Sequence, residues 1–204
     1  MAITDGYCTL VEVKAALRLP ETDTVDDVML SIAIESASRE IEGYTERVFT
    51  STVGTRIYVP MDDYVVQIDD LSALTSIKSS SEGTAFNVTW QPTDYQLEPL
   101  NGISGGLTIP ATRIRAVGDY TWPRWDGGMA EGQEATVQVV GTFGWPSVPF
   151  AVKQACILLS LRQFKRYDSP LGVAGFGEMG AMRVSRLDPD VQALLSPFVK
   201  VRMA

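Results

Sequence analysis

The chain has 204 residues, of which 45% are hydrophobic and 21% charged, a composition typical of a globular protein with one sizeable core. It has no histidine, so Ser-His-Asp triads, Cys-His pairs and histidine metal ligands are excluded, which weighs against an enzyme. The formal net charge of −8 is uneven, because residues 1–150 carry 9 Lys/Arg and 21 Asp/Glu (−12) whereas residues 151–204 carry 8 and 4 (+4). Either the C-terminal quarter binds an acidic partner or the asymmetry is ordinary surface variation.

The cysteines and the N-terminus indicate the compartment. Cys8 and Cys156 lie in separate predicted helices without metal or redox spacing, which predicts two buried, reduced thiols and no disulfide framework. The N-terminus lacks the basic and apolar regions of a signal peptide, and no apolar run approaches the roughly 18 residues of a membrane span. We therefore expect a soluble protein that is made in the cytoplasm and not exported.

Two helices are predicted in residues 1–50. Thr9 and Glu12 have the spacing of a capping box, in which each side chain bonds the other residue's backbone N–H, and Leu19-Pro20 ends the helix that follows. Residues 24–27 start a second, longer helix in the same manner. Its apolar positions, which recur at helical spacing, are Leu30, Ile34, Ala37, Ile41, Tyr44 and Val48.

The pattern changes to a period of two between residues 50 and 145, where Thr, Val, Ile, Tyr and Trp become frequent. This pattern is typical of β-strands. The predicted strands are residues 55–59, 65–68, 74–79, 85–90, 94–97, 106–109, 113–120 and 135–143. Because predicted helices lie on both sides, these strands are interpreted as an antiparallel β insertion.

The C-terminal part begins with a predicted core helix. Across residues 151–161 only three side chains are strongly polar, which is typical of a helix packed on most sides, whereas Arg162 and the basic residues after it leave the core. The glycine-rich residues 169–180 are interpreted as a flexible loop or an adaptable contact. Asp188 as N-cap and Pro189 at the first helical position then start a short last helix.

Together these elements predict an α+β fold. A small helical bundle, made of the N-terminal helix pair, the core helix and the short C-terminal helix, is interrupted by the antiparallel β insertion. We expect the N-terminal helices in residues 1–50, the β insertion in residues 51–145, and the core helix, glycine-rich loop and C-terminal helix in residues 146–204. The first and last of these segments form one structural unit.

Two patterns resemble ligand sites but favour a structural interpretation. GFGEMG at residues 175–180 matches G-x-G-x-x-G, yet it follows a helix rather than a strand, so a nucleotide site is not expected. The acid pairs Asp62-Asp63 and Asp69-Asp70 lack calcium-loop spacing and flank predicted strand ends, which favours solvated turns over catalytic carboxylates or metal ligands. We therefore predict no catalytic residue, no cofactor and no metal.

Two further clusters leave alternatives open. Trp122, Trp125 and Trp145 either form a platform that stacks on sugars or bases or, as is more usual for aromatic residues at strand ends, fill the seam between subdomains. A basic cluster either neutralises phosphates or binds another protein, and no recognition-helix pattern accompanies it. Its members are Arg162, Lys165, Arg166, Arg183 and Arg186.

Several stretches in a fixed order carry a resemblance that covers nearly the whole chain. They are the helix pair at residues 9–48, LSALTSI (71–77), TDYQLEP (93–99), VQVVGTFGWPSVPFAVKQACILL (137–159) and LDPDVQALLSPF (187–198). In this order they resemble the head-tail connector, or adaptor, proteins of long-tailed double-stranded DNA bacteriophages.

The resemblance implies a non-enzymatic virion protein that is made in the host cytoplasm. Copies of it would form a ring, twelve-fold in that family, between the portal protein and the neck, stopper or tail-completion proteins. Double-stranded DNA would pass through the ring without sequence recognition, and no membrane is involved. The family supplies no catalytic residue.

On this resemblance we predict a portal-docking surface and a subunit interface, with residues 171–186 poorly ordered in the free chain and ordered against the portal. The portal-docking residues are Leu171, Phe176, Met179, Arg183, Arg186, Leu194, Leu195 and Phe198. The subunit-interface residues are Glu35, Arg39, Glu42, Arg162 and Arg166. The alternatives are another neck or tail-completion protein, or a carbohydrate-binding module or hydrolase that uses the tryptophans and acid pairs.

Overall fold

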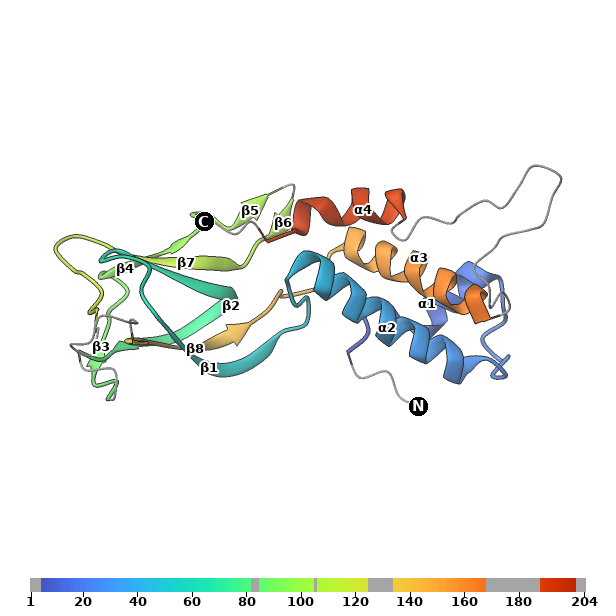
Figure 1. Ribbon diagram of the computed structural model, residues 1–204, viewed down its shortest axis with the longest axis horizontal. Helices are drawn as coiled ribbons and strands as arrows, with labels where there is room; N and C mark the ends of the chain where they lie inside the picture. The colour runs from blue at the N-terminus through green and yellow to red at the C-terminus, as the bar shows by residue number, and fades with distance from the viewer. Residues whose placement is uncertain (1–4, 82–84, 105, 125–133, 168–187, 201–204) are drawn as a thin grey trace. The chain divides into compact units, whose positions relative to one another are not determined.

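The computed structural model describes residues 5–81, 85–104, 106–124, 134–167 and 188–200 (Figure 1). The chain forms two compact units. The helical unit comprises Met1–Arg47 and Val148–Ala204, and the sheet unit comprises Val48–Ser147. The described residues contain four α-helices and a six-stranded antiparallel sheet, so the predicted α+β fold is confirmed.

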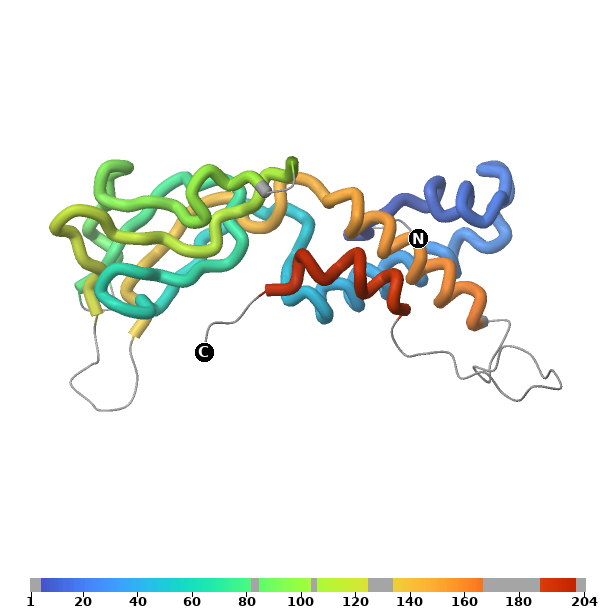
Figure 2. Tube along the Cα trace, turned by 90° about the horizontal axis from the view of Figure 1, so that it is seen from above, coloured from blue at the N-terminus to red at the C-terminus, as the bar shows by residue number. Residues whose placement is uncertain are grey.

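The helical unit is arranged around α3. Its elements are α1 (Leu10–Leu17), α2 (Asp27–Thr45), α3 (Phe150–Tyr167), α4 (Pro189–Leu195) and the 3₁₀ turn η1 (Ser196–Phe198). α3 packs against the other three α-helices and passes between α1 and α4 (Figure 2). Val152, Ala155, Cys156 and Leu159 of α3 are buried, as its apolar pattern predicts.

The capping box at the start of α1 is confirmed. The Glu12 N–H donates to Thr9 Oγ1 at 3.3 Å, and the Thr9 N–H donates to Glu12 Oε2 at 2.8 Å. The Lys153 ammonium donates to the other carboxylate oxygen of Glu12 at 2.9 Å. The backbone bond from Thr9 and the bond from Lys153 hold the pKa of Glu12 below its usual value, because both favour the ionised carboxylate.

The second helix differs from its prediction at both ends. Asp26 is the N-cap of α2 and its side chain makes no capping hydrogen bond, so a second capping start at residues 24–27 is wrong. α2 ends at Thr45 because Glu46 adopts a left-handed conformation, with φ of 54°. Val48, predicted on the buried stripe, therefore lies beyond the helix and is exposed.

A buried lysine joins α1 to the start of α2. Lys14 Nζ donates to the backbone oxygens of Glu21 at 3.2 Å and Asp23 at 2.6 Å, and lies 2.5 Å from a carboxylate oxygen of Asp27. A buried ammonium is tolerated only when such partners surround it. The Lys14 contacts, and not a capping side chain, therefore hold the loop between α1 and α2 at the start of α2.

The main sheet has the strand order β1-β8-β2-β7-β4, with β3 also paired to β2. A separate hairpin joins β5 to β6. The strands are β1 (Thr52–Tyr58), β2 (Val65–Ser79), β3 (Val88–Thr89), β4 (Tyr95–Glu98), β5 (Ile103–Ser104), β6 (Leu107–Thr108), β7 (Ala111–Ala116) and β8 (Val137–Phe143). Alternate residues of β8 are buried, as the period of two predicts.

The long strand β2 corrects the prediction of two strands at residues 65–68 and 74–79. β2 pairs with β7 along its first part and with β8 along its second, with register shifts between Gln67 and Ser76. Asp69 and Asp70 suggested a solvated turn, but both continue the strand. Arg56 Nη1 lies 2.6 Å from Asp69, and Trp145 Nε1 donates to the buried carboxylate of Asp70 at 3.0 Å.

The end of β8 depends on a glycine. Gly144 has a φ of 101°, and its N–H donates to the Asp70 backbone oxygen at 2.7 Å. A Cβ atom at this position would lie 1.9 Å from the Thr50 backbone oxygen, closer than atoms can approach. Both the backbone conformation and the lack of space therefore require glycine here.

We expect Gly144→Ala to lower the free energy of unfolding of the sheet unit by about 3 kcal/mol, because strain and a backbone clash act together. All four tryptophans, at positions 90, 122, 125 and 145, belong to the sheet unit, so tryptophan fluorescence during denaturant unfolding monitors this unit. Gly54→Ala is the matched control, since no atom lies within 4 Å of its added Cβ. Equal free energies of unfolding for the two variants would contradict the requirement for glycine at position 144.

Lys14→Met is expected to lower the free energy of unfolding of the helical unit by about 2 kcal/mol. The methionine fills the same space but leaves the Asp27 carboxylate and two backbone oxygens without their donor. Far-UV circular dichroism during denaturation measures the change. Lys165→Met, at an exposed position of α3, is the control, and a loss of the same size in both variants would refute a specific role for Lys14.

Candidate interaction surfaces

The described residues contain no cluster of three or more Cys, Asp or Glu side chains that could hold a metal ion. The acid pairs are instead bound to neighbouring groups. Asp62 accepts the N–H groups of Tyr64 and Val65 at 2.7 Å each, and Asp63 lies 3.3 Å from the Arg124 guanidinium. Together with the contacts of Asp69 and Asp70, these bonds make the acidic residues structural partners within the sheet unit.

Two of the three tryptophans considered as a sugar-stacking platform are buried. Trp122 stacks on Trp90 with ring centroids 3.7 Å apart, and its indole N–H donates to the Tyr64 backbone oxygen at 3.0 Å. Trp145 is buried against Phe49. Trp125 lies outside the described residues. Trp122 and Trp145 therefore pack the sheet unit and present no open aromatic face for a glycan.

The predicted portal-docking residues divide into two groups. Leu171, Phe176, Met179, Arg183 and Arg186 lie outside the described residues, as does the GFGEMG motif. In the C-terminal helices Leu194 is half-buried, whereas Leu195 and Phe198 are buried. Those two side chains pack inside the helical unit, so they stabilise this unit rather than present a surface to a partner.

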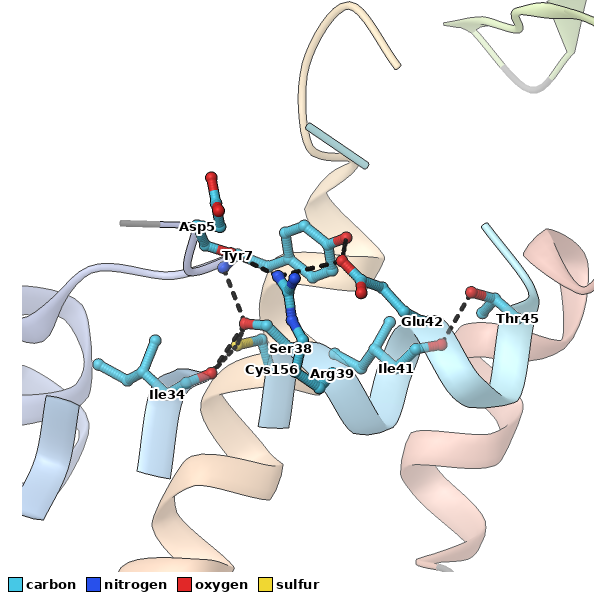
Figure 3. A network of polar contacts seen from close by, with 9 residues as sticks. All are labelled: Asp5, Tyr7, Ile34, Ser38, Arg39, Ile41, Glu42, Thr45 and Cys156. Carbon is cyan, nitrogen blue, oxygen red and sulfur yellow. Dashed lines mark hydrogen bonds and ion pairs between the residues drawn. The ribbon is translucent and has the colours of Figure 1, made fainter. Parts of the chain in front are cut away.

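The predicted interface residues Arg39 and Glu42 of α2 bind the N-terminal segment of their own chain (Figure 3). The Arg39 guanidinium donates to the Asp5 backbone oxygen at 3.0 Å and lies 3.0 Å from the Glu42 carboxylate. The Tyr7 hydroxyl also donates to Glu42. These contacts use part of the hydrogen-bonding capacity of both side chains, and 53% of the Arg39 side chain remains exposed.

The network continues below Arg39 to the buried side of α2 (Figure 3). The Tyr7 N–H donates to Ser38 Oγ at 3.1 Å, and the Ser38 hydroxyl donates to the Ile34 backbone oxygen at 2.8 Å. Tyr7 itself is buried. The segment before α1 is therefore fixed to α2 by backbone and side-chain bonds.

The remaining predicted interface residues lie along α2 and α3. Glu35 is half-buried on α2, Arg162 is half-buried on α3, and Arg166 is exposed near the C-terminal end of α3. Gln163 of α3 donates to the Glu40 carboxylate of α2 at 3.0 Å, which joins the two helices close to these charges.

An exposed apolar stripe was missed by the sequence analysis. Val25 precedes α2 and is 86% exposed, and Val28 and Ile32, on the first turns of α2, are 53% and 43% exposed. Their spacing of three and four residues is a helical period displaced from the buried stripe through Leu30 and Ile34. The spacing of Val25, Val28 and Ile32 can be read from the sequence, but the longer apolar repeat that starts at Leu30 accounted for the helix without it. Branched apolar side chains in contact with water favour association with another surface.

None of the described helices is long and apolar enough to cross a membrane. No family model matches the chain, and no curated protein matches it. Several solved structures match it, among them three that each cover 100% of this chain. One is the neck of a native gene transfer agent particle computed with C12 symmetry, with a TM-score of 0.55, 18% identity, and coverage of 100% of this chain and 94% of that chain.

The second is the neck of an empty gene transfer agent particle computed with C6 symmetry, with a TM-score of 0.54, 17% identity, and coverage of 100% of this chain and 95% of that one. The third is the virion of a native gene transfer agent particle, with a TM-score of 0.53, 19% identity, and coverage of 100% of this chain and 95% of that chain. The chain therefore shares its fold with proteins of these particles, and the predicted resemblance to head-tail connector proteins is confirmed at the level of the fold.

Proposed function

We propose that the chain is a non-enzymatic structural protein of the neck of a phage-like particle. Its role is that of a head-to-tail adaptor, which joins copies of itself in a ring between the portal and the neck or tail proteins. The observation that carries the proposal is the shared fold over 100% of this chain and 94–95% of the matched chains. A match of this extent includes both the helical and the sheet unit, not one common motif.

The subunit contact is assigned to the exposed stripe formed by Val25, Val28 and Ile32. This stripe, on the first turns of α2 and the residue before its N-cap, is apolar surface that its own unit leaves in water. A ring requires two different surfaces on each subunit, so the stripe would face another region of the next copy. Glu35 of α2 and Arg166 of α3 provide opposite charges for the polar rim of such a contact.

The charge distribution suits a ring through which DNA passes. Residues 1–150 carry a formal charge of −12, which repels the phosphate backbone and disfavours binding of the moving genome. Residues 151–204 carry +4 and include residues 171–186, the proposed portal-docking segment. Its arginines would pair with acidic groups of the portal protein.

Another neck or tail-completion protein is the closest alternative, because it would form the same kind of ring and differ only in its order of assembly. The carbohydrate-binding alternative is disfavoured by the burial of Trp122 and Trp145. A hydrolase based on the acid pairs is disfavoured by the structural bonds that those carboxylates make.

The first test of the proposal mixes the purified chain with isolated portal rings and uses electron microscopy to look for an added ring of density. The variant Val28→Glu/Ile32→Glu is expected to stay folded but to reduce ring formation by at least about tenfold, because it places charges where apolar side chains would be buried. Val88→Glu/Ile103→Glu is the control, since both positions are exposed in the sheet unit. If the wild-type chain forms rings and the α2 variant forms them equally well, the subunit contact does not lie on the exposed stripe.

A second test deletes residues 171–186 and measures co-sedimentation with portal rings. The deletion is expected to abolish portal binding while circular dichroism shows that the helices remain, because the segment supplies contacts to the portal and the described core lies outside it. Portal binding at the wild-type level would refute the docking assignment. Failure of the folded wild-type chain to bind portal rings at all would refute the adaptor function itself.

A further inference from the structure

The two cysteines of the chain lie in contact although 148 positions separate them. Cys8 Sγ lies 3.3 Å from Cys156 Sγ, and both thiols are free and buried. Cys156 belongs to α3, as predicted. Cys8 was also predicted in a helix, but it lies in the segment before α1. The contact therefore joins the N-terminal segment to the central helix of the helical unit.

We propose that Cys8 and Cys156 form a covalent modification site, at which a two-electron thiol oxidant converts the pair into a disulfide that fastens the N-terminal segment to α3. The inference differs from the sequence-based expectation of two reduced thiols. It also stands apart from the proposed function, since it rests on the positions of the two sulfur atoms and of the groups that hold them.

The residues on both sides of Cys8 are fixed, which keeps its sulfur beside α3. On one side the Tyr7 N–H is bonded to Ser38 Oγ, which itself lies 3.5 Å from Cys156 Sγ (Figure 3). On the other side Thr9 is held by the capping box with Glu12, and Glu12 is held by Lys153 of α3. Such positioning gives the two thiols a high effective concentration and favours an intramolecular disulfide over links between chains.

The polar surroundings assign different roles to the two sulfurs. The hydrogen bond from Cys8 lowers the pKa of Cys156, because it stabilises the Cys156 thiolate. The same bond to Cys156, together with burial, raises the pKa of Cys8. Because Cys8 is the donor in this contact and Cys156 the acceptor, Cys156 is assigned as the thiol that meets the oxidant and Cys8 as the thiol that resolves the intermediate.

With a peroxide as oxidant the step balances. The Cys156 thiolate attacks one peroxide oxygen, the O–O bond breaks, and a protonated leaving group departs as water, which leaves a sulfenic acid on Cys156. The Cys8 sulfur then attacks the sulfenic sulfur, the S–S bond forms, and the second water leaves. Two thiols are oxidised, one peroxide is reduced, and a dithiol reductant reverses the change.

The burial of both sulfurs controls when this happens. Oxidant reaches them slowly while the N-terminal segment is in place, and a reducing cytoplasm maintains the thiols. If the chain is a virion protein, as proposed above, release of the particle into an oxidising medium would form the cross-link after assembly. Only this timing depends on the proposed function.

The test uses the full chain, which is purified in the presence of a reductant. The reductant is then removed, and the chain is treated with an equimolar amount of hydrogen peroxide. Free thiols are then counted after denaturation, and peptides are mapped by mass spectrometry. The expected result is the loss of both thiols, a single linked peptide pair containing Cys8 and Cys156, and a monomer on a non-reducing gel. The melting temperature should rise by about 5–10 °C, because the cross-link closes a long loop in the unfolded chain.

Cys8→Ser is the control variant and should form no such peptide pair and show no rise in melting temperature on oxidation. The comparison of oxidised with reduced wild-type chain needs no substitution, so it decides the question even if the variant is unstable. Two thiols that remain free after prolonged exposure to peroxide would overturn the proposal. Oxidation to sulfinic acid, or to disulfides between chains, in place of the internal link would overturn it as well.

Discussion

The burial of α3 against α1, α2 and α4 is the interaction on which the helical unit depends. α1 and α2 lie before the β insertion in sequence and α4 lies after it, so no local contact can bring them together. α3 supplies an apolar surface that all of them share, and two of its polar side chains are bonded to neighbouring helices. Lys153 binds Glu12 of α1, and Gln163 binds Glu40 of α2. Burial of apolar surface thus unites the two ends of the chain, and polar pairs set their alignment.

The sheet unit uses its polar and aromatic residues for its own construction. Asp70 is buried and binds both the Trp145 indole and, through its backbone oxygen, the Gly144 N–H. The stacked pair of Trp90 and Trp122 fills the core beside the strands. Buried carboxylates and indoles need hydrogen-bond partners, and here the partners come from within the unit. Among the described residues, Asp70, Trp122 and Trp145 therefore serve the construction of the sheet unit.

A fold alone does not determine function, and association with a partner requires residues that remain at the surface. α2 has two faces with different roles. One face is buried against α3, and the other presents Val28 and Ile32 to water, next to the exposed Val25 that precedes the helix. Arg39 and Glu42 of the same helix hold the N-terminal segment. α2 thus keeps its buried stripe for the helical unit while Val28 and Ile32 stay exposed, and the proposed ring would use this exposed surface.

Local sequence was sufficient for the features that depend on neighbouring residues. The capping box of Thr9 and Glu12, the period of α2, the core character of α3 and the start of α4 at Asp188 were all predicted, since hydrogen bonds and side-chain faces in a helix involve residues three or four positions apart. The features that failed depend on partners far along the chain. β2 continues through Asp69 because it pairs with β7 on one side of this residue and with β8 on the other, the Trp122 and Trp145 side chains are buried by residues distant in sequence, and Cys8 meets Cys156 across 148 positions. No spacing rule links such residues, because the path of the backbone between them determines whether they meet.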